Sequence, residues 1–249
     1  MKALVTAGNT QTPIDRVRCL TNIFTGRTGA LIALEAHQRG HAVTLLTSHP
    51  DVVSTLAGSQ PPDGPNWAVE RYQTFDDLHR LFGEAVRHGG FDAVIHCAAV
   101  SDYAVAGVYV PAAGTAFNAA RGRWQASAGE PALEAMRAGK VKSHHPELWL
   151  RLTPTPKLVD QVRRPWGFAG VLVKFKLEVD MTEPELLAAA ERSRRESDAD
   201  LMVANTLDDR DAWAYLGPLD GRYAKVNRPE LAARLVAAVE ARHRQRRGG

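Results

Sequence analysis

Residues 4–29 read LVTAGNTQTPIDRVRCLTNIFTGRTG, and the order of residue types in this stretch decides the fold. A short apolar run ends in Gly8-Asn9-Thr10, and a second glycine turn, residues 25–29, opens a helical pattern. Glycine lets backbone N–H groups approach a ligand closely, and the N-terminus of a helix favours negative charge. The stretch therefore predicts a floor for the phosphates of a ligand. The alternative is that these glycines only permit tight turns, since no full G-x-G-x-x-G motif is present.

The residues around this stretch predict a βαβ unit. A strand is expected over 2–7, a helix over 29–39 that Gly40 ends, and a second strand over 42–46. Such a unit implies a right-handed crossover between parallel strands. Further strands are expected at 68–72, 91–100, 148–152, 170–179 and 200–205, and further helices at 75–87, 156–162, 183–196 and 229–244. The sequence thus predicts an α/β fold, a Rossmann-like, doubly wound and mainly parallel sheet, in a single domain over 1–249.

Two segments do not fit this pattern. Residues 104–139 are rich in Ala and Gly, and we interpret them as a flap or a hairpin arm inserted into the domain. Residues 243–249 form a basic tail that we expect to fray in solvent. Residues 217–223 are predicted as a turn.

Composition excludes several classes of protein. The 249 residues are 45% hydrophobic and 24% charged, with a net charge of +3 that sits largely in the tail, so no nucleic-acid partner is indicated. No apolar run approaches the ~20 residues of a membrane span, and no signal peptide opens the chain, so we expect a cytoplasmic protein without a membrane partner. The two cysteines indicate neither a disulfide framework nor a metal site.

A few polar residues could carry chemistry. The Asn22 carboxamide lies between the two glycine turns and can hydrogen-bond a developing negative charge without titrating, although asparagine is also common in caps and turns. Asp102 follows a predicted strand, where it could bind a metal ion or act as a helix cap. Lys140 and Lys142 share a face in extended chain and could neutralise a polyphosphate or lie in solvent. His96, inside an apolar strand, is expected to be a core residue.

Taken together, six motifs in one order resemble phosphopantothenate–cysteine ligases. The resemblance spans most of the chain except about 104–139, and each motif is weak alone but the ordered set is specific. The free-standing format and Phe175-Lys176-Leu177-Glu178 look more like the monofunctional ligases than the bacterial fusion with a flavin decarboxylase. The other motifs are Thr6–Thr10 with Pro13-Ile14-Asp15-x-Val17-Arg18, Thr21–Gly29, Ala98–Tyr103, Lys140–Ser143 and Asp200–Asn205.

The resemblance implies a ligase of coenzyme A biosynthesis with a Rossmann-like fold. In such a ligase, ATP or CTP activates the carboxylate of 4′-phosphopantothenate as an acyl-nucleotidylate with release of pyrophosphate, and Mg²⁺ accompanies the nucleotide. The amine of L-cysteine then attacks the activated acyl group. The resemblance also implies a homodimer in which the partner helps to close the substrate site.

The same resemblance assigns residue roles. Asn22 matches the asparagine that holds the acyl-nucleotide intermediate, and Lys140 matches a lysine of a flap near the triphosphate; both are candidate catalytic residues. Asp102 is also the candidate metal ligand. The candidate nucleotide-binding residues are Gly8, Thr10, Thr25, Gly26, Gly29, Ala98, Ala99, Asp102, Lys140, Pro156, Lys157, Leu158, Val159 and Phe175.

Some positions depart from the family pattern. Ser193 and Ser197 stand where CTP-using ligases carry two lysines, which favours ATP slightly, and Thr206 replaces a usual aspartate. A diverged paralogue with another acid or amine is therefore a further alternative. An NAD(P)-dependent reductase is disfavoured because Leu46-Thr47-Ser48 puts no ribose-binding carboxylate at the end of the second strand. A nucleotide-binding module without chemistry also remains open.

Overall fold

The computed structural model describes residues 1–58, 62–136, 139, 141–142 and 144–248. Contacts within the chain form two compact units. We call Met1–Thr10, Asn22–Val100 and Lys157–Gly249 the sheet unit, and Gln11–Thr21 with Ser101–Pro156 the arm unit. The sequence predicted one domain with an insertion at 104–139; the arm unit is larger, because residues 11–21 and the chain up to Pro156 pack with that segment.

The sheet unit is built on one eight-stranded sheet. Its order is β15-β14-β13-β12-β6-β1-β4-β5, and neighbouring strands from β13 to β5 run parallel, whereas β14 and β15 are antiparallel additions. This confirms the predicted mainly parallel α/β fold. The strands are β1 (Lys2–Ala7), β4 (Ala42–Thr47), β5 (Trp67–Arg71), β6 (Ala93–His96), β12 (Val171–Glu178), β13 (Leu201–Thr206), β14 (Trp213–Leu219) and β15 (Arg222–Asn227).

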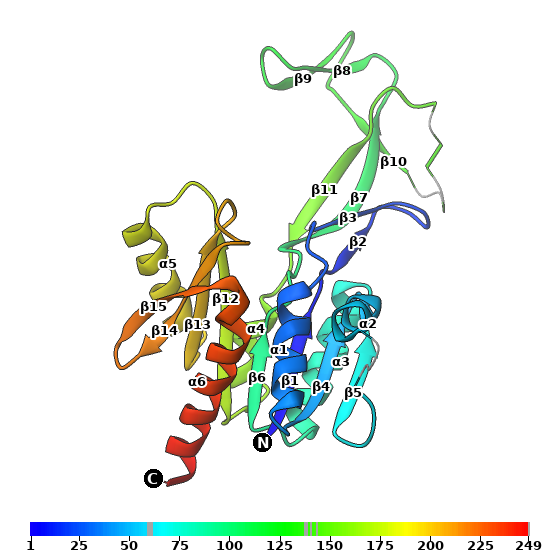
Figure 1. The fold of residues 1–249 in the computed structure, drawn as a ribbon. Helices are drawn as coiled ribbons and strands as arrows, with labels where there is room; N and C mark the ends of the chain where they lie inside the picture. The colour runs from blue at the N-terminus through cyan, green and yellow to red at the C-terminus, as the bar shows by residue number, and fades with distance from the viewer. Residues whose placement is uncertain (59–61, 137–138, 140, 143, 249) are drawn as a thin grey trace. The chain divides into compact units, whose positions relative to one another are not determined.

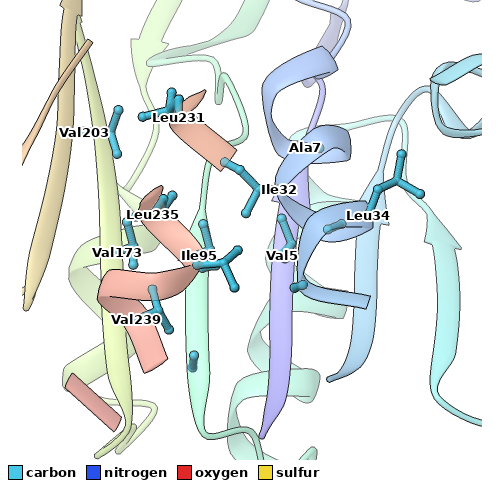
Figure 2. Close-up of a cluster of buried hydrophobic side chains, with 14 of the residues drawn as sticks. Val5, Ala7, Ile32, Leu34, Ile95, Val173, Val203, Leu231, Leu235 and Val239 are labelled. Atoms are coloured by element: carbon cyan, nitrogen blue, oxygen red, sulfur yellow. The ribbon is translucent and has the colours of Figure 1, made fainter. Parts of the chain in front are cut away.

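Helices cover both faces of this sheet (Figure 1). Side chains alternate between the faces, as the two-residue period of a strand requires: Val5 and Ile95 pack under the first set of helices, Leu4 and Val94 under the second. Figure 2 shows the first cluster, in which strands β1, β6, β12 and β13 face α1 and α6. The first set is α1 (Arg27–Gln38), α2 (Pro50–Ala57) and α6 (Arg228–Gly248), and the second is α3 (Phe75–His88), α4 (Leu158–Arg163) and α5 (Glu183–Glu196).

The predicted helices agree with the observed helices, apart from one short helix and the C-terminal end of the chain. Thr74 caps α3 as its sequence predicts, with a hydrogen bond from Asp77 N at 3.2 Å. The sequence missed α2 and predicted only a turn at 217–223, where β14 and β15 form a hairpin. The prediction that the tail frays is wrong for residues 243–248, which continue α6, and Arg246 donates to Asp200 Oδ1 at 2.6 Å.

The arm unit is antiparallel throughout. Its three-stranded sheet has the order β10 (Leu133–Ala135), β7 (Tyr103–Pro111), β11 (Trp149–Pro154). Two separate pairs are β8 (Thr115–Asn118) with β9 (Arg123–Ala126) and β2 (Gln11–Pro13) with β3 (Cys19–Thr21). Phe117, Trp124 and Trp149 join the β8–β9 pair to β11, with ring centroids 4.4–5.3 Å apart. The described residues of the 104–139 segment therefore contribute antiparallel strands to the arm unit.

Candidate functional site

The sheet unit has a topological switch point between β1 and β6. The chain runs from β1 outward through β4 and β5, and then returns to the other side of β1 at β6. In open α/β sheets, ligands bind in the crevice beyond the carboxyl ends of the strands at such a point. There, Ala99 N donates to Gly8 O at 2.8 Å and Thr10 N donates to Ala99 O at 3.3 Å. The first turn and the Ala98-Ala99 segment predicted from the sequence therefore meet at this edge.

The two glycine turns pack directly on each other. Gly8 and Gly26 have φ of +90° and +84°, and a Cβ at Gly26 would overlap the backbone nitrogen of Gly8. A Cβ at Gly29 would lie 2.7 Å from that of Ala7, so this contact also needs glycine. The glycines thus have a packing role that requires no ligand. Gly26 is the N-cap of α1 and provides no side-chain cap, and the first turn holds no acidic residue, so this helix start is electropositive.

Asn22 lies at the switch point. Its Nδ2 donates to Ala99 O at 2.9 Å, and its own carbonyl accepts from the side chain of Asn9. Asn9 is 6% exposed and is held in turn by Ser48, whose hydroxyl accepts from Asn9 N at 2.9 Å and donates to Asn9 Oδ1 at 3.1 Å. The Asn22 side chain is half-buried at the strand ends rather than in the hydrophobic core. Its catalytic role stays a prediction, and this geometry is compatible with it.

Asn9 and Ser48 are polar residues of this edge that the sequence interpretation did not select. Asn9 follows Gly8 inside the quoted turn, so its position was a usable signal. Ser48 follows the second strand, β4, at the position where a dinucleotide-binding fold carries a carboxylate.

Other predicted nucleotide-binding residues have different surroundings. Thr10 is fully buried. Thr25 lines an open pocket of about 180 Å³ together with Arg27 and Asp51. At the start of α4, Lys157 is the N-cap, while Leu158 and Val159 are 1% and 6% exposed and face the core. Only the backbone of 158 and 159 can therefore contact a ligand.

The remaining predicted residues lie on β12, in the arm unit or outside the described chain. Phe175 on β12 is half-buried against the core cluster of α1 and α6. Asp102 and Pro156 belong to the arm unit; Asp102 is exposed, and its carbonyl accepts from Thr155 N at 2.9 Å. Lys140 lies outside the described residues. Across the described ranges, no three His, Cys, Asp or Glu side chains gather in a way that suits a metal ion.

An arginine from a distant part of the sequence reaches the first turn of α1. Arg228, at the start of α6, donates to Thr28 Oγ1, although the two residues are 200 positions apart. Burial lowers the pKa of Arg228, and the nearby Cys97 and Asp211 oppose this effect. Burial raises the pKa of Cys97 to about 12, so this thiol is neutral, and Gly29 N–H bonds to it. No local sequence signal pointed to Arg228.

Within the arm unit, Asp15 and Arg18 hold the chain at Val141. Asp15 Oδ2 accepts from Val141 N at 3.1 Å, and Arg18 donates to Val141 O at 2.9 Å. The Arg18 side chain also pairs with the Asp15 carboxylate at 2.6 Å. This hydrogen bond holds the pKa of Asp15 well below its usual range, and the backbone N–H groups of Val17, Val141 and Arg18 act in the same direction. Asp15 and Arg18 of the first motif thus contact Val141 of the Lys140–Ser143 motif within the arm unit.

His96 is a core residue, as expected. It is 7% exposed, stacks on Phe82 with ring centroids 4.9 Å apart and contacts Thr6 Oγ1 at 2.8 Å through Nδ1. Burial lowers its pKa to about 4, with help from the positive charge of Lys174, so the ring is neutral at pH 7.

Comparison with known proteins finds relatives in coenzyme A biosynthesis. Residues 1–110 match the model of the DNA/pantothenate metabolism flavoprotein C-terminal domain. The chain is 32% identical over 246 residues to the coenzyme A biosynthesis bifunctional protein CoaBC of Thermococcus kodakarensis. This alignment covers 96% of this chain and 51% of that protein. It is 24% identical over 206 residues to CoaBC of Methanocaldococcus jannaschii, covering 83% of this chain and 40% of the relative. The chain therefore spans about half the length, or less, of the curated relatives it matches.

Solved structures give the same result at the level of the fold. The DNA/pantothenate metabolism flavoprotein of Streptococcus pneumoniae has a TM-score of 0.74 and 27% identity, with 97% of this chain and 99% of that chain covered. A Cab2 mutant in complex with phosphopantothenate-cysteine has a TM-score of 0.66 and 18% identity, with 98% and 86% covered. In the described part of the chain, no helix combines the length and the apolar character that a membrane crossing needs. The family resemblance found in the sequence is thus confirmed, and residues 1–110 are similar to the DNA/pantothenate metabolism flavoprotein C-terminal domain.

Proposed function

We propose that this chain joins 4′-phosphopantothenate to L-cysteine as a ligase of coenzyme A biosynthesis, through an acyl-nucleotidylate intermediate. The similarity to CoaBC over 96% of the chain supports the reaction class, and the Cab2 complex with phosphopantothenate-cysteine supports the substrates. The observation that carries the proposal is the bond between Asn22 Nδ2 and Ala99 O at 2.9 Å, because it holds a neutral amide at the switch point between the two glycine turns.

The chemistry follows from the poor reactivity of a free carboxylate. A carboxylate oxygen of 4′-phosphopantothenate attacks the α-phosphorus of the nucleotide, and pyrophosphate leaves. The amine of cysteine then attacks the acyl carbon, loses a proton and displaces the nucleoside monophosphate. In this scheme the first turn of α1 and the Gly8 turn bind the phosphates, and the Asn22 amide hydrogen-bonds the charge that develops on the acyl oxygen. Lys140 neutralises the triphosphate.

A magnesium ion is part of the proposal. Mg²⁺ bound with a nucleotide takes most of its ligands from phosphate and water and needs only one or two carboxylates. A single exposed carboxylate, Asp102, fits that requirement without a preformed cluster of ligands. When bound, the ion supplies positive charge to the phosphates.

For the nucleotide we propose ATP over CTP, because Ser193 and Ser197 replace the lysines expected of CTP-using ligases. We also propose a homodimer. Its support is the presence of exposed large apolar side chains in the arm unit, among them Val17, Tyr103 and Leu152, which are 63%, 53% and 42% exposed.

One screen tests the function. Pyrophosphate release is measured with ATP, CTP, GTP or UTP and Mg²⁺, with and without 4′-phosphopantothenate and cysteine. We expect release that needs 4′-phosphopantothenate, and a product with the mass of phosphopantothenoylcysteine only when cysteine is present. No turnover with any nucleotide, under conditions in which CoaBC of Thermococcus kodakarensis is active, would overturn the proposal.

A second candidate is a diverged paralogue that uses another acid or amine, which the serines at 193 and 197 and Thr206 favour. It predicts pyrophosphate release with a different acid or amine in the same screen. A reductase would instead show a thermal shift with NADPH and none with nucleoside triphosphates.

A further inference from the structure

Lys174 is a lysine in the interior of the sheet unit. It lies on β12 beside His96 of β6, and it is 7% exposed. Lysine is rarely buried unless its charge is paired, because removing an ammonium group from water is costly. Burial lowers the pKa of Lys174, and the nearby Asp160 carboxylate opposes that effect. The groups that surround the ammonium group therefore decide what it does.

The partners of Lys174 come from two helices. Its Nζ donates to Ser193 O at 3.0 Å and to Ser197 Oγ at 2.5 Å. The first acceptor is in the last turn of α5, where carbonyl groups lack partners within the helix and the helix dipole favours a cation. Lys174 therefore stabilises the C-terminus of α5 and fixes it to β12.

A hydrogen-bonded chain continues from Lys174 to α4. Ser197 Oγ, which accepts from the ammonium group, donates its own proton to Asp160 Oδ1 at 2.5 Å. The Asp160 carboxylate also lies 3.7 Å from Lys174 Nζ. Asp160 is in the first turn of α4, three residues after the N-cap Lys157. One buried charge thus fixes the beginning of α4 against β12 and the end of α5.

The beginning of α4 includes residues 157–159, which belong to the proposed nucleotide-binding set. Since Leu158 and Val159 face the core, a base bound there would be recognised by backbone N–H and carbonyl groups. Recognition by backbone depends on where the backbone is held, to a fraction of an ångström. Phe175, also in that set, directly follows Lys174 on β12.

We propose that Lys174, through Ser197 and Asp160, is the positioning residue that sets which nucleotide base this chain accepts. The inference rests on the proposed function for the location of the base. It also gives Ser197, where a lysine was expected, a role: its hydroxyl binds a lysine that comes from the strand.

The test compares Lys174→Met and Ser197→Ala with a matched control, Lys176→Met. Lys176 is two residues further on the same strand, and it pairs with Glu178 at 3.0 Å instead of with α4 and α5. For each protein, kcat and the KM for the nucleotide are measured with ATP, CTP, GTP and UTP, and the KM for cysteine is measured as well. Loss of a hydrogen bond to a charged group corresponds to an effect of about tenfold.

We expect Lys174→Met to change the ratio of kcat/KM between the preferred nucleotide and the next one by about tenfold, mainly through KM for the nucleotide. Ser197→Ala should act in the same direction, and KM for cysteine should stay within about twofold in both, since the change is local. The control should change neither. Ser197→Ala, which keeps the bond to Ser193 O, decides the matter if Lys174→Met does not fold.

Equal loss of activity with all four nucleotides would overturn the inference and make Lys174 a structural residue only. If the wild-type chain turns over no substrate, the proposed function fails separately, and calorimetric binding of the four nucleotides replaces kinetics. A changed binding preference in the two variants would then support the role of Lys174, whereas an unchanged preference, or no nucleotide binding by the wild type, would overturn it.

Discussion

The side-chain nitrogen of Asn22 lies 2.9 Å from the carbonyl oxygen of Ala99, which joins the loop before α1 to the segment after β6. The same carbonyl accepts from Thr10 N at 3.3 Å, so one oxygen binds both loops that flank the switch point. A neutral amide donates to this carbonyl, whereas a carboxylate in its place would repel it. The contact therefore explains, from local chemistry, why an amide suits this position.

Replacing Asn22 tests the proposed catalytic role. We expect Asn22→Ala to lower kcat by about 10²–10³-fold, the effect of losing one donor to a developing charge. The reaction should stall at or before the acyl-nucleotidylate, and the melting temperature should change by only a few degrees, since Asn22 is half-buried outside the core. Asn118→Ala is the control, because Asn118 bonds to Gln125 within the arm unit. A variant with unchanged kcat would remove Asn22 from the mechanism.

The contact between the glycine turns predicts unequal effects of two similar substitutions. Gly26 and Gly40 both have positive φ, +84° and +82°, but only Gly26 has backbone atoms where a Cβ would stand; Gly40 has nothing within 4 Å. We expect Gly40→Ala to cost about 1–2 kcal/mol of stability from backbone strain. Gly26→Ala should cost a further ~1–3 kcal/mol from overlap with Gly8. Urea denaturation measures both, and equal losses would contradict the packing explanation.

Glu191 on α5 predicts a pH dependence of stability. Hydrogen bonds from Arg194, and then from Arg195 and Tyr223, lower its pKa to about 2 against the opposing effect of burial. Because the pKa of Glu191 in the folded chain is below its ordinary value of 4.5, the stabilisation is complete above pH 4.5 and disappears as the pH falls toward 2. Glu191→Gln should therefore cost on the order of 2 kcal/mol at pH 7 and progressively less below pH 4.5.

Urea titrations of the wild type and Glu191→Gln at pH 7, 4.5 and 3 check this expectation. Glu84→Gln is the matched control, because Glu84 is 53% exposed and lies 3.4 Å from Arg80. An exposed pair of this kind contributes only about 0.5 kcal/mol. A difference between wild type and Glu191→Gln that stays constant down to pH 3 would be inconsistent with the lowered pKa.

Local patterns predicted the elements whose causes are local. Leu4 and Val5 are buried on opposite faces because their strand lies between two helical layers, and Thr74 caps α3 together with Asp77, three residues further along the chain. The hairpin of β14 and β15 was missed because Gly217 and nearby residues signal turns as strongly as strands.

Contacts between distant residues could not be predicted in this way. The α6 tail is held by Arg246, which donates to Ala169 O at 2.6 Å and to Asp200, and neither partner is close in sequence. The same limit applies to the candidate site. Gly8, Asn22 and Ala99 could be selected as candidates because they lie in or between glycine turns or at a predicted strand end, whereas the contacts of Ser48 and Lys174 come from packing between distant residues.

Arg228 provides a prediction that separates binding from stability. A guanidinium group at the first turn of α1 adds positive charge where the phosphates are proposed to lie, and arginine suits phosphate because of its fixed donors. We expect Arg228→Leu to weaken ATP binding by about tenfold, the effect of one hydrogen bond to a charged group. The loss should be smaller at high salt, since salt screens a half-exposed charge.

The control is Arg234→Leu, because Arg234 is an exposed residue on the same helix, and this variant should bind ATP like the wild type. Calorimetry with ATP alone measures binding, and denaturation measures folding. If Arg228→Leu lowers stability but leaves the affinity for ATP unchanged, then the bond to Thr28 only joins α1 to α6.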